Sequence, residues 1–272
     1  MNPSNQFLKE IEAKLKDLAE ETDRFKRSAF FKEYLDTMSR FWDYSYHNQL
    51  LIHFRMPSAT RVAGFKAWQS LKRNVKKGSK AIKILAPYKR VVSEINPQTM
   101  EEEEKEMTLF FPVNVFDISQ TEGEPLPEID ISIEGDDWKN FLKQLKKFCK
   151  SHRIKVDFRN LGINGLYGYS KGGEIAVSST ESINTQVNTI IHEIAHELLH
   201  KEKERKSLSK QQKEIQAEAT AYVVTKHFNL RNKSFNYLAL YDADYKKIME
   251  NLKAVAEASK EIIGFLEEEL GG

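Results

Sequence analysis

The sequence predicts a two-domain protein of the α+β class. Three observations support this: apolar residues recur at helical spacing up to about residue 54, β-branched and aromatic runs follow from Ala81, and three further helical segments close the chain. With 272 residues, the chain is long enough for one large domain or two of ordinary size.

The N-terminal half is expected to combine amphipathic helices with a β-hairpin. Apolar residues at three- and four-residue spacing, such as Phe7, Ile11 and Leu15, predict helices between residues 5 and 54. The runs at 81–95 and 108–118 predict two strands, and the charged segment 96–107 between them predicts a solvated loop. This half is therefore predicted to consist of helices plus a hairpin or small sheet.

The C-terminal half begins with a mixed segment and ends in helices. Residues 138–151 predict a helix, 154–159 a short strand, and 166–179 a hairpin with its turn at Lys171, Gly172 and Gly173. Helical patterns then cover residues 183–201, 210–228 and 245–269.

Charge is distributed unevenly along the chain, although the formal net charge is only +2. Residues 61–90 contain ten Lys or Arg and no acid, whereas residues 121–137 contain seven acids and no Lys or Arg. An acidic, proline-containing segment after a basic block is typical of a linker, because like charges keep it solvated and extended. We expect a first domain at 1–124, an acidic linker at 125–137 and a second domain at 138–272.

Several classes of protein are excluded by composition. No apolar run approaches the roughly 18 residues that a membrane-spanning helix needs, so no membrane partner is expected. The first forty residues lack a secretory signal pattern, which favours a cytoplasmic protein. Cys149 is the only cysteine, so there is no disulfide framework and any metal must be held by histidine and carboxylate.

The stretch HEIAHELLH points to a metal site. His192 and His196 are four residues apart, so on a helix they lie about 40° apart around the axis and both imidazoles can meet one ion. Glu193 lies beside that face, where a carboxylate can act as the general base of hydrolysis. The chance occurrence of this short pattern is the alternative, and the apolar neighbours of the motif argue against it because they predict a buried helix.

The third metal ligand is expected on the next helix. On a continuous helix His200 lies about 12 Å along the axis from His192, too far to share an ion, so it is interpreted as a helix-end residue. Glu214 follows His196 by eighteen residues, which leaves room for a turn and an antiparallel helix. We therefore expect Glu214 as the third ligand of a zinc ion, and Glu218 as a carboxylate that accepts the other N–H of a histidine. Two surface glutamates are the alternative interpretation.

HEIAHELLH followed by EIQAEATAYVV resembles the ImmA/IrrE-type metallopeptidases. In these gluzincin-like proteins, two histidines and a downstream glutamate hold zinc. The resemblance implies a zincin-like fold for the second domain, with His192, His196 and Glu214 as ligands.

Three blocks in the first half resemble the single-stranded DNA-binding domain of ArdC-type antirestriction proteins. They are WDYSYHNQLLI, VAGFKAWQSLKRNVKKGSKAIKILAP and NVFDISQTEG, in that order. The likeness covers roughly residues 35–123 and 165–225, and it implies single-stranded DNA as a partner.

The residue types in these blocks suit that role. Cations can neutralise phosphates without sequence preference, and aromatic rings can stack on unpaired bases. The aromatics could equally be core residues, since large rings are often buried. The candidate nucleic-acid-binding residues are Tyr44, Tyr46, Lys66, Trp68, Lys72, Arg73, Lys76, Lys77 and Lys80.

These observations predict a single-stranded DNA-binding zinc metallopeptidase of antirestriction type. Its substrate would be a peptide bond in a DNA-associated or regulatory protein. The alternative is a protein that coats and protects single-stranded DNA and whose zinc site is structural or vestigial.

Overall fold

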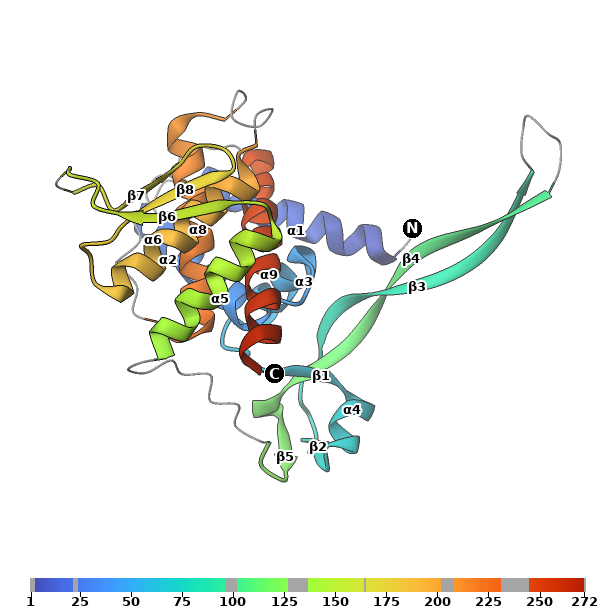
Figure 1. Ribbon diagram of the computed structural model, residues 1–272. Helices are drawn as coiled ribbons and strands as arrows, with labels where there is room; N and C mark the ends of the chain where they lie inside the picture. Colours follow the sequence, from blue (N-terminus) through green and yellow to red (C-terminus); the bar gives the residue numbers. More distant parts are fainter. Residues whose placement is uncertain are drawn as a thin grey trace. The chain divides into compact units, whose positions relative to one another are not determined.

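The computed structural model describes residues 3–21, 24–95, 102–126, 137–163, 165–201, 208–230 and 245–271. They form two compact units, here called the first unit (Met1–Lys14 and Leu50–Leu126) and the second unit (Leu15–Gln49 and Pro127–Gly272). Figure 1 shows a mixture of helices and small sheets, which confirms the expected α+β class. Most of the expected acidic linker, residues 127–136, lies outside the described residues.

The first unit contains the start of helix α1 (Pro3–Glu20) and the end of helix α3 (Tyr46–Arg55). Apolar residues of α1 are buried at helical spacing, as expected, with Phe7 9% and Ile11 1% exposed. The Arg55 guanidinium pairs with Glu10 at 2.9 Å and lies over the Phe7 ring at 5.2 Å. These contacts join the two helix ends within the unit.

Two small antiparallel sheets complete the first unit. One has the order β1-β4-β3, from β1 (Val62–Gly64), β3 (Ile82–Ile95) and β4 (Glu102–Asp117). The other pairs β2 (Arg73–Val75) with β5 (Thr121–Gly123). The short helix α4 (Phe65–Ser70) follows β1 directly.

Strand β4 begins earlier than its sequence suggests. Residues 102–107 were expected in a solvated loop because of their acids, but they continue the antiparallel pairing, with Glu106 opposite Val91 and Glu102 opposite Ile95. Strand pairing can include charged residues when both faces of the ribbon are solvated, which the charge pattern alone did not reveal. Residues 96–101 lie outside the described residues.

Asp117 connects the parts of the first unit at the end of β4. It is 1% exposed and caps the 3-10 helix η1 (Ile118–Gln120), accepting from the Ser119 N–H at 3.0 Å. Its other oxygen accepts from the backbone N–H groups of Thr60 at 2.7 Å and Arg61 at 3.0 Å. A buried carboxylate with three backbone donors ties the segment before β1 to the end of β4.

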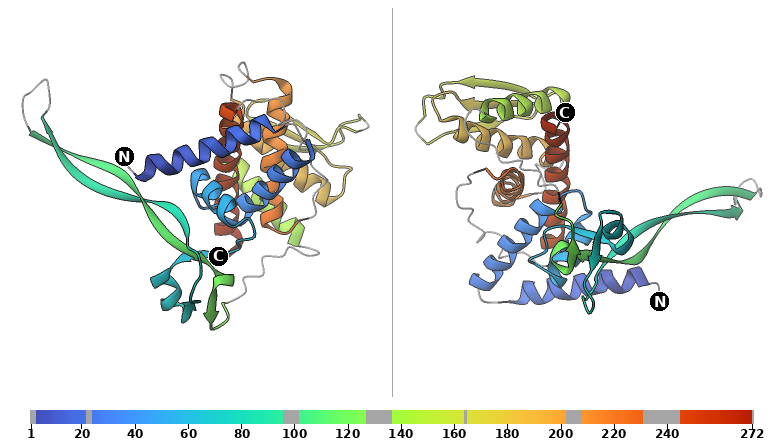
Figure 2. Two further views of the ribbon diagram at one scale, coloured as in Figure 1. Left: turned by 180° about the vertical axis from the view of Figure 1, so that it is seen from behind. Right: turned by 90° about the horizontal axis from the view of Figure 1, so that it is seen from below.

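The second unit is built on a three-stranded sheet with the order β6-β8-β7. β6 (Lys155–Arg159) is parallel to β8 (Glu174–Ser178), and β7 (Gly168–Ser170) is antiparallel to β8 at the edge. Helices α5 (Asp137–Ser151), α6 (Ile183–Leu199), α8 (Lys210–His227) and α9 (Tyr245–Gly271) agree closely with the helices expected there. Figure 2 shows the sheet and these helices from two further sides.

Helix α2 (Arg24–Arg40) packs on α8 and so belongs to the second unit. The Tyr222 hydroxyl donates to Asp36 at 2.6 Å, and His227 Nδ1 lies 2.8 Å from the carbonyl oxygen of Ser39. Lys260 donates to the carbonyl oxygen of Asp43 at 2.5 Å. Residues 15–49 therefore pack with residues far along the chain, which the charge pattern could not indicate. The division of the chain into functional domains at 1–124 and 138–272 stays a prediction.

No helix in the described residues is long and apolar enough to cross a membrane.

Candidate metal centre

Helix α6 presents the two motif histidines in the middle of the second unit. Ser182 begins the helix, and its hydroxyl accepts from the backbone N–H of Thr185 at 3.2 Å. The apolar positions Ile190, Ile191 and Ile194 are fully buried, which fixes the rotation of the helix and the direction of its polar residues.

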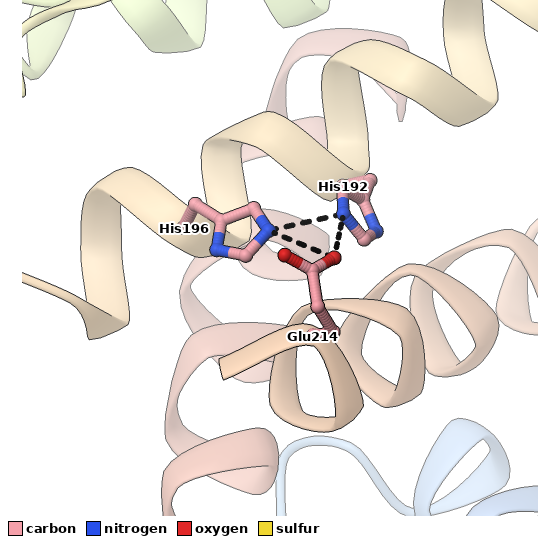
Figure 3. Close-up of side chains that lie close together, drawn as sticks. All are labelled: His192, His196 and Glu214. Carbon is pink, nitrogen blue, oxygen red and sulfur yellow. Dashed lines mark hydrogen bonds and ion pairs between the residues drawn. The ribbon is translucent and has the colours of Figure 1, made fainter. Parts of the chain in front are cut away.

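The three expected ligands converge on one point (Figure 3). His192 Nε2 and His196 Nε2 lie 3.0 Å apart, and they lie 3.4 Å and 3.6 Å from Oε2 of Glu214 on α8. A tetrahedral zinc ion with bonds of about 2.0–2.1 Å requires its ligand atoms to be about 3.3 Å from one another. The three side chains are thus already spaced as the ligands of one divalent metal ion, and they leave one tetrahedral position free.

The carboxylates of the cluster create a negative electrostatic environment around the two histidines. Hydrogen bonds from His192 and His196 hold the pKa of Glu214 well below its usual range, so its carboxylate is ionised. Burial lowers the pKa of His192, but the hydrogen bond to Glu214 and the surrounding carboxylates outweigh burial and leave this pKa raised. A divalent cation bound between these side chains would be stabilised by the same carboxylates.

Glu193 is placed next to the metal ligands and is 7% exposed. Burial raises its pKa, while a hydrogen bond with the Ser170 side chain of β7 opposes that rise. Gly168 of the same strand passes so close to α6 that a Cβ there would lie 3.6 Å from Glu193 Cγ and 2.5 Å from Thr189 Cγ2. The absence of a side chain at Gly168 therefore lets β7 lie directly beside Glu193.

His200 has a role that the sequence did not reveal. It was interpreted as a helix-end residue, and it does form the C-cap of α6, but its ring is 1% exposed and lies in a hydrogen-bonded chain. His200 Nδ1 is 2.9 Å from His196 Nδ1, and His200 Nε2 is 2.9 Å from Gln216 Oε1. Gln216 in turn donates to Asn251 Oδ1 at 2.6 Å.

The direction of this chain sets the tautomer of His196. Because Gln216 Oε1 can only accept, His200 Nε2 carries a hydrogen and His200 Nδ1 is the acceptor. His196 Nδ1 then donates, which leaves the lone pair of His196 Nε2 directed at the candidate metal position. The reverse direction would put a hydrogen on His196 Nε2 and prevent metal binding there.

Glu218 was expected to provide that kind of support. It is exposed, and no hydrogen bond in the described part of the chain joins it to a histidine. Its influence on His192 is electrostatic, and partial desolvation of its carboxyl group raises its own pKa. The structure assigns the support of His196 to His200 instead, because His200 ends the same helix one turn further on.

Glu197 holds the β7–β8 turn on α6. It is 8% exposed, and its two carboxylate oxygens accept from the backbone N–H groups of Gly172 at 2.8 Å and Gly173 at 2.5 Å. Both glycines have positive φ, 72° and 91°, which favours glycine at this turn. The sheet edge is thereby tied to the helix that carries the candidate ligands.

The expected nucleic-acid-binding residues are divided between the two units. Tyr44 and Tyr46 belong to the second unit and are half-buried, whereas the cations belong to the first. Trp68 is 2% exposed, and its indole N–H donates to the carbonyl oxygen of Phe116 at 2.9 Å. Trp68 is therefore a core residue, and we withdraw it as a stacking residue.

The cations of the basic block divide into two groups. Lys72 pairs with Glu124 at 3.3 Å, Arg73 donates to Thr121 Oγ1 at 2.9 Å, and Lys76 donates to the carbonyl oxygen of Ser119 at 3.1 Å. These three contacts stabilise the segment 119–124 next to β2. The other three candidate cations, Lys66, Lys77 and Lys80, are exposed on the first unit, as are Lys72 and Lys76.

Known proteins match both halves of the chain. A family model described as the N-terminal domain of anti-restriction factor ArdC matches residues 2–116. A second, the peptidase family M78 model described as an IrrE N-terminal-like domain, matches residues 149–265. An uncharacterized protein of Bacillus anthracis is 26% identical over 86% of this chain, and the chain spans about half (46%) of that relative's length.

The solved structures that match the chain include two of the antirestriction ArdC protein from plasmid R388. The metal-free crystal structure has a TM-score of 0.50 and 18% identity, with 84% of this chain and 85% of that chain covered. The Mn(II)-bound structure has a TM-score of 0.46 and 14% identity, with 87% and 97% covered.

The chain thus has two parts, and the second part matches the peptidase family M78 model and contains residues fit to hold a divalent metal ion. The chain has the ArdC-type architecture: an ArdC N-terminal domain followed by an IrrE-like domain of peptidase family M78. The resemblance found in the sequence motifs is confirmed.

Proposed function

We propose that the protein is a cytoplasmic, single-stranded DNA-binding zinc metallopeptidase of antirestriction type. The observation that supports this most directly is the spacing of the ligand atoms of His192, His196 and Glu214, 3.0–3.6 Å, next to the buried Glu193. Zinc is the metal proposed because two imidazole nitrogens and one carboxylate oxygen with an open fourth position are typical of catalytic zinc.

The mechanism follows from the positions of the chain's own side chains. Zinc would polarise the scissile carbonyl and lower the pKa of a bound water molecule. Glu193 takes the proton of the attacking water and passes it to the leaving amine, so it acts as base and then as acid. Its burial supports both steps, because a raised carboxyl pKa brings it closer to the operating pH.

Strand β7 offers a place for the substrate backbone. It is the edge strand of the β6-β8-β7 sheet and runs beside Glu193, with Ser170 in hydrogen-bonding contact with that carboxylate. An extended peptide can pair with such an edge through main-chain hydrogen bonds. The substrate proposed is therefore an extended segment of a DNA-associated or regulatory protein.

The test separates metal binding from hydrolysis. Purified full-length protein is analysed for zinc and manganese by mass spectrometry and assayed on a fluorogenic peptide library. We expect about one zinc ion per chain, retained in Glu193→Gln and lost in Glu214→Ala, and no hydrolysis by either variant. Loss of zinc in Glu193→Gln, or hydrolysis by it, would contradict the roles assigned.

The alternative is a protein that coats and protects single-stranded DNA without hydrolysing peptides. It is favoured by the assignment of these residues to different units: the exposed cations Lys66, Lys77 and Lys80 belong to the first unit and the metal ligands to the second. The discriminating measurement is protection of single-stranded DNA from nuclease by Glu193→Gln and His192→Ala. Full protection by both variants would show that DNA protection does not depend on the metal centre.

A further inference from the structure

Helix α6 carries two rows of polar side chains that meet different partners. Residues four apart on a helix lie about 40° apart around its axis, so they form a row along one side. One row holds the two candidate histidine ligands and meets Glu214 of α8. The second row, here called the strand-facing row, meets β7 and the β7–β8 turn, and its members are Thr189, Glu193 and Glu197.

The contacts of the strand-facing row follow β7 in sequence order. Thr189 lies at Gly168, where an added Cβ would come within 2.5 Å of its Cγ2. Glu193 hydrogen-bonds with the side chain of Ser170, two residues further along β7. Glu197 accepts from two backbone N–H groups of the turn that follows, at 2.8 and 2.5 Å. Four residues of helix advance about 6.0 Å and two residues of strand about 6.6 Å, so the steps along the two elements match.

The same alternate residues of β7 present their main-chain groups to the open edge of the sheet. β7 is the last strand in the order β6-β8-β7, so it pairs with β8 on one side. The backbone N–H of Lys171 donates to the carbonyl oxygen of Glu174 across the hairpin. In an antiparallel pair every second residue bonds to the partner strand, so Gly168 and Ser170 direct their N–H and C=O groups away from β8. An extended peptide that adds to this edge would pair with these two residues, beside Glu193.

We propose that Glu197 is a positioning residue of the peptidase site, which fixes β7 along α6 so that the edge of β7 holds the substrate backbone beside Glu193. The inference rests on the proposed peptidase function and adds a residue to that site. Glu197 acts through the strand and is not itself a catalytic residue. Its carboxylate suits this role, because an ionised acceptor forms strong, directed bonds with consecutive backbone N–H groups.

The β7–β8 turn does not depend on Glu197 for its own closure. The hairpin is closed by the backbone bond from Lys171 to Glu174 at 2.8 Å, and glycine occupies the two turn positions with positive φ, Gly172 at 72° and Gly173 at 91°. What Glu197 adds is the attachment of the closed turn to α6. This attachment lies one helical turn beyond Glu193 on the same row, where it fixes the position of β7 beside that carboxylate.

The experiment compares Glu197→Gln with a control that loses a hydrogen bond elsewhere in the second unit. Glu197→Gln keeps the size of the side chain but turns an NH2 group toward a backbone N–H donor. The control, Tyr222→Phe, removes the hydroxyl that donates to Asp36 at 2.6 Å. Zinc-loaded full-length proteins are assayed on a peptide that the wild-type protein cleaves. We expect Glu197→Gln to raise KM about tenfold with zinc content unchanged, and Tyr222→Phe to change KM less than twofold.

Hydrogen exchange followed by mass spectrometry measures the attachment of β7 independently of activity. We expect Glu197→Gln to speed exchange in residues 168–174 and to leave residues 183–195 unchanged, because only the hairpin is released. If Glu197→Gln does not fold, Gly173→Ala tests the same contact from the strand side. A Cβ at Gly173 would meet nothing within 4 Å, but its φ of 91° disfavours alanine and shifts the turn away from Glu197. Its KM is expected to rise severalfold.

The outcomes separate this inference from the proposed function. If the wild-type protein cleaves the peptide and both variants keep its KM, the positioning role is overturned while the peptidase function stands. Faster exchange of the hairpin in Glu197→Gln with an unchanged KM would make Glu197 a structural attachment only, and would also overturn the proposal. If the zinc-loaded wild-type protein cleaves no peptide, the proposed function itself fails and this assignment fails with it.

Discussion

His200 shows how one side chain can prepare another for metal binding. The chain from Asn251 through Gln216 and His200 ends on His196 Nδ1, with every step between 2.6 and 2.9 Å. A histidine binds a metal through an unprotonated ring nitrogen. The group that accepts a hydrogen bond from its other ring nitrogen therefore affects the metal affinity.

Substitution of His200 tests this role. His200→Leu is expected to lower zinc affinity about 10- to 100-fold, because His196 Nδ1 loses its acceptor. His200→Gln offers a carbonyl oxygen to the same N–H and is expected to restore most of the affinity. Competition with a chromophoric chelator measures both, and the absorption spectrum of the cobalt-substituted protein reports the ligand geometry. Equal affinity of the leucine and glutamine variants would refute the positioning role.

Strand β7 is the element that brings the sheet to the candidate site. Its position depends on Gly168, where a Cβ would lie 2.5 Å from Thr189 Cγ2 and 2.8 Å from the carbonyl oxygen of Ala176. Both distances are far below van der Waals contact, and one of the atoms is backbone, so the strand must move if a side chain is added.

Gly168→Ala is therefore expected to displace β7 from Glu193 while leaving the three metal ligands, which lie on helices, in place. Zinc content should stay near one ion per chain, and hydrolysis of the peptide library should fall at least tenfold. Gly64→Ala is the control, since a Cβ at Gly64 would meet nothing within 4 Å. Unchanged hydrolysis in Gly168→Ala would show that the position of β7 does not matter for activity.

The junction at Asp117 makes the first unit sensitive to acid. Burial tends to raise the pKa of Asp117, but hydrogen bonds from the backbone of Ser119, Thr60 and Arg61 outweigh burial and leave this pKa lowered. A carboxylate with a lowered folded-state pKa stabilises the fold above its unfolded pKa of about 3.9. That contribution is lost as pH falls through the folded-state value.

Asp117→Asn is expected to lower the free energy of unfolding of the first unit by about 2 kcal/mol at pH 7, because an amide cannot accept all three N–H groups. The difference between the variant and the wild-type protein should begin to shrink below about pH 4, where Asp117 of the unfolded chain becomes protonated, and should disappear once the pH falls through the lower folded-state pKa. Urea unfolding at pH 7 and pH 3 measures both values. A difference that is the same at the two pH values would contradict the ionised role of Asp117.

At the scale of the whole molecule, the second unit is assembled from two separate stretches of sequence. Residues 15–49 contribute α2, which packs on α8 through Asp36 with Tyr222 and Ser39 with His227. A chain cut at the expected domain boundary, residues 138–272, lacks these partners and exposes the face of α8 that α2 covers.

We therefore expect a fragment of residues 138–272 to melt at a lower temperature than a variant in which residues 50–126 are replaced by a long Gly/Ser linker. Both contain His192, His196 and Glu214, but only the second keeps the contacts of α2. Thermal melts followed by circular dichroism, with zinc content, compare the two. Equal melting temperatures would mean that α2 adds nothing to the stability of this unit.

Much of the fold was accessible from the sequence because it depends on local periodicity. The helices at 183–199 and 210–227 and the hairpin around Gly172 were expected within a few residues of their observed limits. The α+β class and the ArdC-type architecture are confirmed as well. Both could be predicted from the sequence, since the strings that carry the resemblance are short and local. The short elements β1, α4, β2 and β5 were missed, because segments of three to six residues have too few positions for a period to emerge.

The sequence by itself determined that His192 and His196 share one side of a helix, because four residues at a rise of about 1.5 Å place them one turn apart whatever surrounds them. Only the tertiary structure decided that Glu214 meets them at 3.4 and 3.6 Å, that His200 supports His196, and that Trp68 is buried. Those outcomes depend on which elements pack together. Packing joins residues far apart along the chain, and no spacing within a single element encodes it.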